Sequence, residues 1–224
     1  MNIIKGLITK DLLQLKSYRK TLILFIIIFI SISISQETTK GIEGMLVIML
    51  TLGLGMFAVA TFNYDESAKA DKYILTLPLT RKEIVLSKYV LVICTTTIGS
   101  IIGMIASGIT TFAISKQMPD IPELISFGLG AILGIGIVES IQIPCIYKYG
   151  AEKGRLQIFI IAGIGALLAG GLFIVGEKLN LNLPMNSILN FISNFWAIIL
   201  LLAIVIIYYI SFRISNRIYS KKEI

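Results

Sequence analysis

Six long apolar runs dominate the sequence and restrict what the chain can fold into. A helix rises about 1.5 Å per residue, so roughly 20 apolar residues cross the hydrocarbon core of a bilayer, which is about 30 Å thick. The runs are continuous rather than alternating, which disfavours an outer-membrane barrel. The sequence therefore predicts an all-α, polytopic membrane protein with six transmembrane helices, and five spans is the alternative because the first run is short. The runs cover residues 21–35, 45–62, 89–115, 124–147, 156–176 and 191–212.

Composition excludes several other classes of protein. Of the 224 residues, 56% are hydrophobic and 15% are charged, whereas about 25% charge is typical of soluble domains. A soluble enzyme, a secreted disulfide scaffold and a disordered chain are therefore excluded. The chain has no His, and Cys94 and Cys145 lie in or beside apolar runs, so we expect neither a metal centre nor a disulfide. Without a Gly-rich phosphate-binding loop or a cluster of catalytic residue types, we expect no catalytic residue and no cofactor on this chain.

Positive charge is concentrated in alternate segments between the runs. Residues 1–20, 63–88, 148–155 and 213–224 hold 17 of the 20 Lys and Arg residues. By the positive-inside rule these four segments face the cytoplasm, so both termini are expected inside. The net charge of +7 is then a consequence of topology, and no nucleic-acid partner is needed to explain it. We expect residues 1–224 to form one transmembrane domain, with residues 213–224 as a cytoplasmic tail.

The segment before the first run has helical periodicity. Within residues 1–20, apolar side chains recur on one side and polar side chains on the other, which predicts an amphipathic helix on the inner membrane surface, its lysines towards anionic lipid headgroups. Such a helix either anchors the topology, which composition alone favours, or supports a cytoplasmic partner. The apolar positions are Ile3, Ile4, Leu7, Ile8, Leu12 and Leu15, and the polar ones are Lys5, Thr9, Lys10 and Gln14.

The second cytoplasmic loop, residues 63–88, is longer than a helical hairpin needs and too short for a domain. We predict a short charged helix over residues 65–75, followed by the start of the third span. A helix held between two rigid connections indicates a docking element, and a plain solvated loop is the alternative. The residues behind this prediction are Asp65 and Glu66 at the helix start, Pro78 at its end, and Thr80 with Glu83 as a capping box for the next helix.

Two stretches of the chain resemble the ABC-2 family of transporter permeases. Within that family the chain is most similar to small six-span subunits of bacterial peptide exporters, of the phenol-soluble modulin type and of the bacitracin or lantibiotic resistance type. The span pattern matches too, so the resemblance covers essentially the whole chain. The matching residues are Tyr64-Asp65-Glu66, Lys72-Tyr73 and Leu77-Pro78-Leu79-Thr80-Arg81 in the second loop, and Pro144, Tyr147-Lys148-Tyr149-Gly150, Glu152-Lys153 and Arg155 after the fourth span.

The resemblance implies a half-transporter in the bacterial cytoplasmic membrane. Two permease chains, identical or different, would form an export pathway for an amphipathic or antimicrobial-type peptide or another hydrophobic cargo. A separate ATP-binding-cassette ATPase subunit, carrying ATP and magnesium, would dock on the N-terminal helix and the second loop. There we expect Tyr73 and Ile74 to insert into the ATPase while charged residues set the register. A non-transporting scaffold or immunity-type protein is the alternative. The expected docking residues are Asp65, Glu66, Lys69, Asp71, Lys72, Tyr73 and Ile74.

A few polar and small residues stand out within the spans. Glu139 is the only acidic residue inside a predicted span, and Gln142 follows three positions later on the same helix face. A carboxyl group in a membrane usually faces the bundle interior or a wet cavity, so lining of the pathway and helix–helix hydrogen bonding are equal alternatives.

Two series of small residues predict close helix packing, within one chain or between two chains. They are Gly99, Gly103 and Ser107, and Gly130 and Gly134.

Overall fold

The computed structural model describes residues 2–17, 19–34, 42–74, 76, 78–116, 118–154 and 185–221, and for residues 185–200 it describes the backbone alone. Throughout these ranges the regular secondary structure is helical and no strand is present. The predicted all-α fold is therefore confirmed. The helices are α1 (Asn2–Ser17), α2 (Arg19–Ile34), α3 (Ile42–Ser67), α4 (Ala70–Ile74), α5 (Arg81–Ser115), α6 (Ile121–Tyr149) and α8 (Met185–Ser220).

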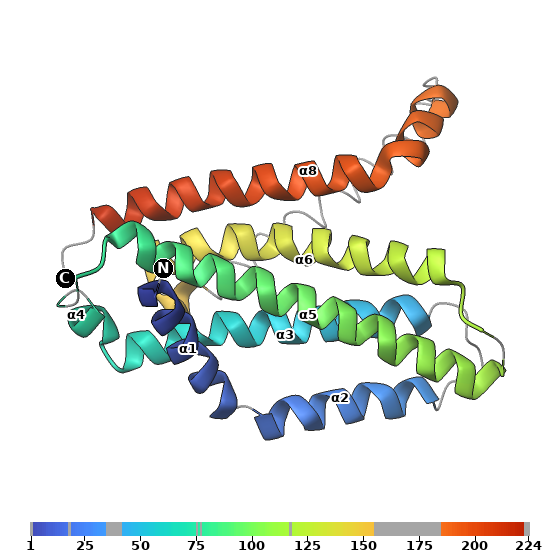
Figure 1. The fold of residues 1–224 in the computed structure, drawn as a ribbon, viewed down its shortest axis with the longest axis horizontal. Helices are drawn as coiled ribbons and strands as arrows, with labels where there is room; N and C mark the ends of the chain where they lie inside the picture. The colour runs from blue at the N-terminus through green and yellow to red at the C-terminus, as the bar shows by residue number, and fades with distance from the viewer. Residues whose placement is uncertain are drawn as a thin grey trace.

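Four long helices, α3, α5, α6 and α8, run along the long axis of the molecule (Figure 1). The shorter α2 packs against α3 and α5, and α1 crosses the bundle near one end, where it contacts α3 and α5. The same end carries α4, the start of α5 and the last turn of α8 (Figure 1). We call it the α4 end of the bundle, and the distribution of Lys and Arg predicts that it faces the cytoplasm.

Four helical segments are long and apolar enough to cross a membrane: Gly44–Ser67, Arg81–Ser115, Ile121–Tyr149 and Leu201–Ser220. They correspond to the second, third, fourth and sixth predicted spans. The first predicted span forms α2, which has 16 residues and is short for a bilayer crossing. The fifth, residues 156–176, lies outside the described residues. A membrane-embedded helical bundle is thus confirmed, and the total of six spans stays a prediction.

The outward faces of these helices are apolar, as expected for surfaces in contact with lipid. The exposed large hydrophobic side chains along α2, α5 and α8 are 37–66% exposed. The buried core, in contrast, is concentrated towards the α4 end, where side chains of α1, α3, α5, α6 and α8 pack together. Representative exposed residues are Ile23, Leu24 and Ile27 on α2, Ile101, Ile105 and Ile109 on α5, and Leu202, Val205 and Ile206 on α8.

The predicted capping box at the start of the third span is present. Glu83 N–H donates to Thr80 Oγ1, and the Glu83 carboxylate accepts from Thr80 N–H at 2.8 Å. These reciprocal bonds satisfy backbone groups that a helix N-terminus otherwise leaves unpaired. At the end of α6, Gly150 N–H donates to Ile146 O at 2.9 Å, and Gly150 has φ +87°, a positive value that glycine adopts without strain.

Small residues allow α3 and α5 to approach closely. A Cβ added at Gly99 would lie 3.0 Å from Thr51 Cα, and one at Gly103 would lie 2.9 Å from Val47 Cα. This confirms close packing within one chain for the first of the two predicted series. At Gly130 and Gly134 on α6, in contrast, no described residue lies within 4 Å of an added Cβ.

Candidate functional site

The predicted docking segment consists of two helices rather than one. α3 continues through Asp65 and Glu66 to Ser67, and α4 covers only Ala70–Ile74. Between them Lys69 has φ +48°, a left-handed conformation that interrupts the helix. The prediction of a single helix over residues 65–75 is therefore wrong at its start.

The two acidic residues lie in the last turn of α3, where the helix dipole disfavours negative charge. The structure supplies a compensating partner for each. Asp65 is paired with two lysines from other helices, and Glu66 accepts a backbone N–H from beyond α6. These tertiary contacts outweigh the dipole preference from which a helix start was predicted, and they explain the error.

Asp65 belongs to a buried charge cluster that joins α1, α3 and α5. The cluster consists of Lys10, Asp11, Asp65 and Lys88. Lys88 Nζ lies 2.6 Å from Asp65 Oδ2 and 2.9 Å from Asp11 Oδ1. Lys10 Nζ lies 2.7 Å from Asp65 Oδ1 and 3.1 Å from Asp11 Oδ1. With two charges of each sign, the cluster is neutral overall.

Burial makes this arrangement energetically important. Asp11 is 1% exposed and Lys88 is 6% exposed, so neither charge is stable there without the other. Lys88 also donates to Thr61 Oγ1 at 3.2 Å and lies 5.1 Å from the centre of the Phe62 ring. These contacts fix α1 against α3 and α5, because separating the helices would leave buried charges unpaired.

Lys10 completes the cluster from its partly exposed edge. Burial alone would lower the pKa of the Lys10 ammonium, but its hydrogen bond to Asp65 and the nearby charges of Asp11 and Asp65 outweigh that effect and raise the pKa above its ordinary value. The prediction that this lysine points towards lipid headgroups is therefore wrong. Gln14, also predicted on the outward face, donates to Asp65 at 3.1 Å instead.

The N-terminal helix therefore presents a mixed face to the bundle. Leu7 is buried and Leu15 packs against the core, while Leu12 and Leu13 are 50% and 62% exposed. Ion pairing through Asp11 turns the helix so that one charged edge faces inward and two leucines face outward. An apolar outward edge suits a helix lying on a membrane.

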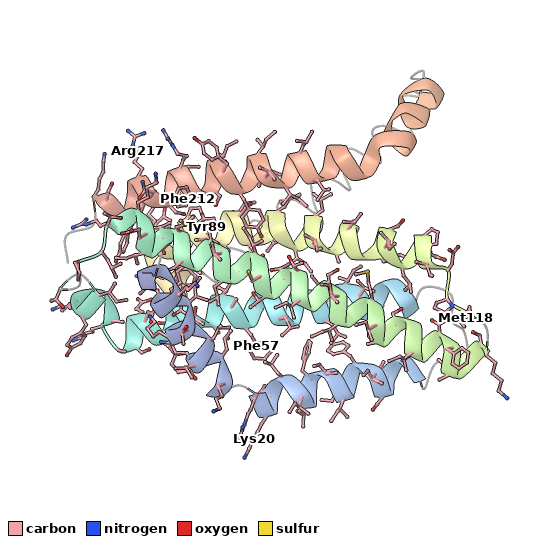
Figure 2. The ribbon with its side chains drawn as sticks, in the orientation of Figure 1. Lys20, Phe57, Tyr89, Met118, Phe212 and Arg217 are labelled. Atoms are coloured by element: carbon pink, nitrogen blue, oxygen red, sulfur yellow. The ribbon has the colours of Figure 1, made fainter. Side chains whose placement is uncertain are left out.

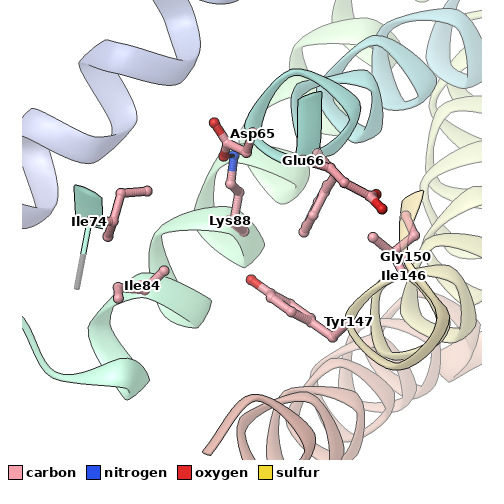
Figure 3. Close-up of a pocket in the computed structure, with 9 residues that line it drawn as sticks. Asp65, Glu66, Ile74, Ile84, Lys88, Ile146, Tyr147 and Gly150 are labelled. Atoms are coloured by element: carbon pink, nitrogen blue, oxygen red, sulfur yellow. Dashed lines mark ion pairs between the residues drawn. The ribbon is translucent and has the colours of Figure 1, made fainter. Parts of the chain in front are cut away.

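Glu66 links the end of α3 to the segment after α6. Its Oε2 accepts the Ala151 N–H at 2.5 Å, and a Cβ added at Gly150 would lie 2.7 Å from Glu66 Oε1. Figure 3 shows Glu66 directed towards Gly150. Both residues, together with Lys88, line a cavity of about 70 Å³. Tyr147 forms another wall of that cavity (Figure 3). The two stretches that carry the family resemblance thus meet in space.

α4 packs against the core through Ala70 and Ile74 and exposes Tyr73. Ile74 is 8% exposed and belongs to the core, whereas Tyr73 is 73% exposed. Lys69 and Lys72 are also exposed, and the side chain of Asp71 lies outside the described residues. Ile74 was predicted to insert into a partner, and instead it anchors α4 to its own chain.

Glu139 lies where four helices meet. Its carboxylate accepts hydrogen bonds from Thr96 Oγ1 of α5 at 2.9 Å and from Tyr208 OH of α8 at 2.9 Å. Gly55 of α3 leaves the room that the carboxylate occupies, since a Cβ added there would collide with Glu139 Oε1. Glu139 is 2% exposed. Its described contacts are hydrogen bonds between helices, and a place in a transport pathway stays a prediction.

Hydroxyl groups continue this polar region towards the α4 end. Tyr89 OH lies 2.5 Å from Ser211 Oγ and 2.8 Å from Ser215 Oγ, and Ser211 donates to Ser140 O. Gln142 is 1% exposed, and among the described residues neither its side-chain oxygen nor its nitrogen has a hydrogen-bond partner. The described part of the chain holds no group of three or more His, Cys, Asp or Glu side chains arranged to bind a metal.

Comparison with known protein families identifies the family of the chain but not a subtype within it. A family model described as ABC-2 family transporter protein matches residues 6–220, nearly the whole chain. The chain belongs to the ABC-2 transporter family. No curated protein matches it. As an ABC-2 family member the chain is a membrane component of a transporter, and the family in general associates with an ATP-binding-cassette ATPase.

Asp11 and Lys88 of this ABC-2 protein are site residues that the sequence patterns did not predict. The position of each residue relative to neighbouring apolar residues could have indicated its role. Asp11 is four residues from both Leu7 and Leu15, on the face of α1 that is otherwise apolar, and Lys88 directly precedes an apolar run. A lone acid and a lone base at the apolar faces of two helices favour an ion pair between them, whereas the positive-inside count treated Lys88 only as a loop charge.

Proposed function

We propose that the chain is the permease subunit of an ATP-binding-cassette exporter. Two such chains, identical or different, form the export pathway in a bacterial cytoplasmic membrane. A separate ATPase subunit binds ATP and magnesium and docks at the α4 end, which faces the cytoplasm together with both termini. The observation that carries this proposal is the family match over residues 6–220, combined with a short helix at one end of the bundle that buries Ile74 in the core and exposes Tyr73.

The docking surface that we propose consists of Lys69, Lys72 and Tyr73. All three side chains are exposed, and Tyr73 is a large aromatic group that is 73% accessible. Exposed aromatic residues of this kind commonly anchor protein–protein contacts, and nearby charges set register and association rate. An acidic rim on the ATPase would complement the two lysines.

Movement of α4 has a direct mechanical route into the membrane. Ile74 joins α4 to the core, and Glu66, three residues before Lys69 in the break, accepts a hydrogen bond from the segment after α6. The charge cluster ties the end of α3 to α1 and α5 through Asp65 and Lys88. A ligand can shift a protein between two states only through contacts that differ between those states. We infer that the ATPase acts on the spans through these connections.

A hydrophobic or amphipathic peptide is the cargo that we propose. A groove of about 330 Å³ opens between α2 and α3, and its walls are apolar except for Asn63. Such a surface accepts aliphatic and aromatic side chains without stranding polar groups. The resemblance to subunits of peptide exporters supports the same cargo class. The groove is lined by Phe25, Leu52, Gly53, Met56, Phe57, Ala60 and Asn63.

The second permease chain has a candidate contact face on α6. Gly130 and Gly134 are exposed, one turn apart, and unopposed by any described residue within 4 Å. Pairs of small residues at this spacing let transmembrane helices approach closely. A second chain packed against this face would place two bundles side by side.

Co-purification and ATP turnover test the proposal. The chain would be co-expressed with an ATP-binding-cassette ATPase from the same organism, purified, and reconstituted in lipid. We expect a stable complex whose ATP hydrolysis rises with a cationic amphipathic peptide and not with a matched non-amphipathic peptide of the same composition. Stimulation by lipid alone would contradict the peptide cargo.

The alternative function is a membrane scaffold or immunity-type protein. That alternative predicts protection of cells against a peptide without any ATPase in the complex. Absence of a co-purifying ATPase, with normal expression of the chain, would contradict the exporter and favour the scaffold.

A further inference from the structure

A second groove opens on the opposite side of the bundle from α2, between the start of α5 and the last turns of α8. Its volume is about 650 Å³. Three of its lining side chains are cationic, two are aromatic, one is aliphatic and one is an amide, and none is acidic. The lining residues are Lys82, Tyr209, Phe212, Arg213, Ile214, Asn216 and Arg217.

Two of the three cations of this groove lie on one face of α8, and none of the three forms an ion pair within the described chain. Tyr209, Arg213 and Arg217 follow one another at intervals of four residues, which places them in a row along α8. Lys82 approaches from the second position of α5. Among the described residues, none forms an ion pair with Lys82, Arg213 or Arg217. Figure 2 shows Arg217 on the outer side of α8.

A separate contact holds the two walls of the groove together. Arg81 Nη1 donates to Tyr219 O at 3.0 Å and to Ser220 O at 2.7 Å. These hydrogen bonds join the start of α5 to the end of α8. The two helix ends lie side by side in Figure 1. Because Arg81 occupies the terminal carbonyls, the negative end of the α8 dipole is offset where it would otherwise repel an anion.

The groove also lies at the right level for the headgroup of a lipid. Along α8, the exposed apolar residues Val205 and Ile206 are followed by the aromatic Tyr209 and then by Arg213 and Arg217. Aromatic residues concentrate at the boundary between hydrocarbon and headgroups, and arginines extend beyond it. The row therefore runs from acyl-chain level to phosphate level.

We propose that this groove binds an anionic phospholipid, with its phosphate between Lys82, Arg213 and Arg217 and its acyl chains along the apolar face of α8. Arginine pairs bind phosphate oxygens bidentately, and basic pockets between transmembrane helices are suited to acidic headgroups. Asn216 supplies a neutral donor for the glycerol or headgroup hydroxyls. The site does not depend on the transport cargo.

A second copy of the chain is a poorer occupant of the same groove. In a symmetric dimer this face would meet its own copy, and six cations would oppose one another without an acid among the lining residues. A lipid provides the negative charge that the groove lacks, and its acyl chains match the aromatic and aliphatic side chains of the groove. We therefore assign the groove to lipid and keep chain–chain contact as an outcome of the test.

Lipid binding by the full-length chain in detergent tests the proposal. Native mass spectrometry would compare phosphatidylglycerol with phosphatidylcholine of the same acyl chains, using wild type and the double variant Arg213→Gln with Arg217→Gln. We expect wild type to retain phosphatidylglycerol in preference, and the variant to bind it roughly 30-fold more weakly. Binding to wild type should also weaken as salt rises.

Matched variants separate the groove from general attraction between charges. Arg19→Gln with Lys20→Gln removes two exposed cations at the start of α2 and should keep phosphatidylglycerol binding. Arg213→Lys with Arg217→Lys keeps both charges and should keep most of the binding, which controls for misfolding. Equal retention of both lipids by wild type, equal losses in the two Gln pairs, or a change of oligomeric state with unchanged lipid binding would each overturn the proposal.

Discussion

The ammonium of Lys88 lies 2.9 Å from the carboxylate of Asp11 across the contact between α5 and α1, and both side chains are almost fully buried. Removing the cation leaves the buried carboxylates of Asp11 and Asp65 close together with only Lys10 to balance them. Breaking a buried pair from one side typically costs about 3–5 kcal/mol. We therefore expect Lys88→Met to destabilise the purified chain by about 3 kcal/mol or more, measured by denaturant or thermal unfolding in detergent.

Two variants control this prediction. Lys82→Met removes a cation from the same helix at an exposed position and should change stability by no more than about 0.5 kcal/mol. Lys88→Met combined with Asp11→Asn restores the balance of charge and should recover part of the loss. If the single variant Lys88→Met unfolds at the same denaturant concentration or temperature as the wild type, the charge cluster does not hold α1 in place.

The charge cluster also marks the limit of what the sequence predicts. Local signals were sufficient for the capping box of Thr80 and Glu83 and for the close approach at Gly99 and Gly103, since each depends on a few neighbouring residues. The contacts of Lys88 with Asp11 and of Lys10 with Asp65 join residues 77 and 55 positions apart. No local pattern specifies such pairs.

The same limitation explains the errors in the docking segment. The acidic residues after the second span favoured a helix start by the dipole rule, but partners from α1, α5 and the segment after α6 stabilise them at a helix end. Ile74 and Tyr73 are adjacent apolar residues, and the sequence alone does not distinguish the one that is buried from the one that is exposed. The packing of α4 against the core decides this.

Gly55 and Glu139 offer a test of the packing at the centre of the bundle. A Cβ at position 55 would collide with the Glu139 carboxylate, so Gly55→Ala should destabilise the chain by about 1–3 kcal/mol through overpacking. In a Glu139→Ala background the carboxylate is absent, and the same change should be nearly neutral. Unfolding measurements on the four proteins of this double-mutant cycle give the coupling directly.

Gly130→Ala is the matched control for that cycle. It lies on α6 with no described residue within 4 Å of the added Cβ, so replacing glycine in a helix should stabilise the isolated chain by up to about 1 kcal/mol. A cost of Gly55→Ala that persists in the Glu139→Ala background would contradict the collision with the carboxylate.

Glu139→Gln separates the two alternatives for this carboxyl group. The amide keeps the size of the side chain and can still accept from Tyr208 OH and Thr96 Oγ1. If Glu139 lines the pathway, the variant should alter cargo preference or transport rate at normal expression and assembly. A lower folding yield with unchanged transport per assembled complex would assign Glu139 to helix–helix hydrogen bonding instead.

The predicted orientation can be tested at two exposed positions at opposite ends of the bundle. Met118, in the connection between α5 and α6, is 85% exposed and lies far from the α4 end (Figure 2), whereas Lys72 lies in α4. In a chain whose native Cys94 and Cys145 are replaced, we expect a membrane-impermeant maleimide to label Met118→Cys in intact cells. Lys72→Cys should react only after permeabilisation, and labelling in the reverse order would invert the topology.

Tyr73 and Ile74 allow docking and coupling to be separated within one helix. Tyr73→Ala removes an exposed side chain, so unfolding should change by less than about 0.5 kcal/mol, while affinity for the ATPase should fall about tenfold or more if Tyr73 anchors the contact. Ile74→Ala removes a buried side chain and should cost the chain about 2–5 kcal/mol. Because the exposed surface is intact, it should bind the ATPase but transmit less peptide stimulation to ATP turnover.

The two variants are distinguished by measuring binding and turnover on the same reconstituted complexes. Met118→Ala, an exposed change at the opposite end of the bundle, should leave both quantities at wild-type values. Normal binding and normal peptide-stimulated turnover in Tyr73→Ala would remove α4 from the docking surface. If Ile74→Ala loses ATPase binding to the same extent as Tyr73→Ala, its buried contact maintains the position of the docking surface, and the proposed transmission through the core is wrong.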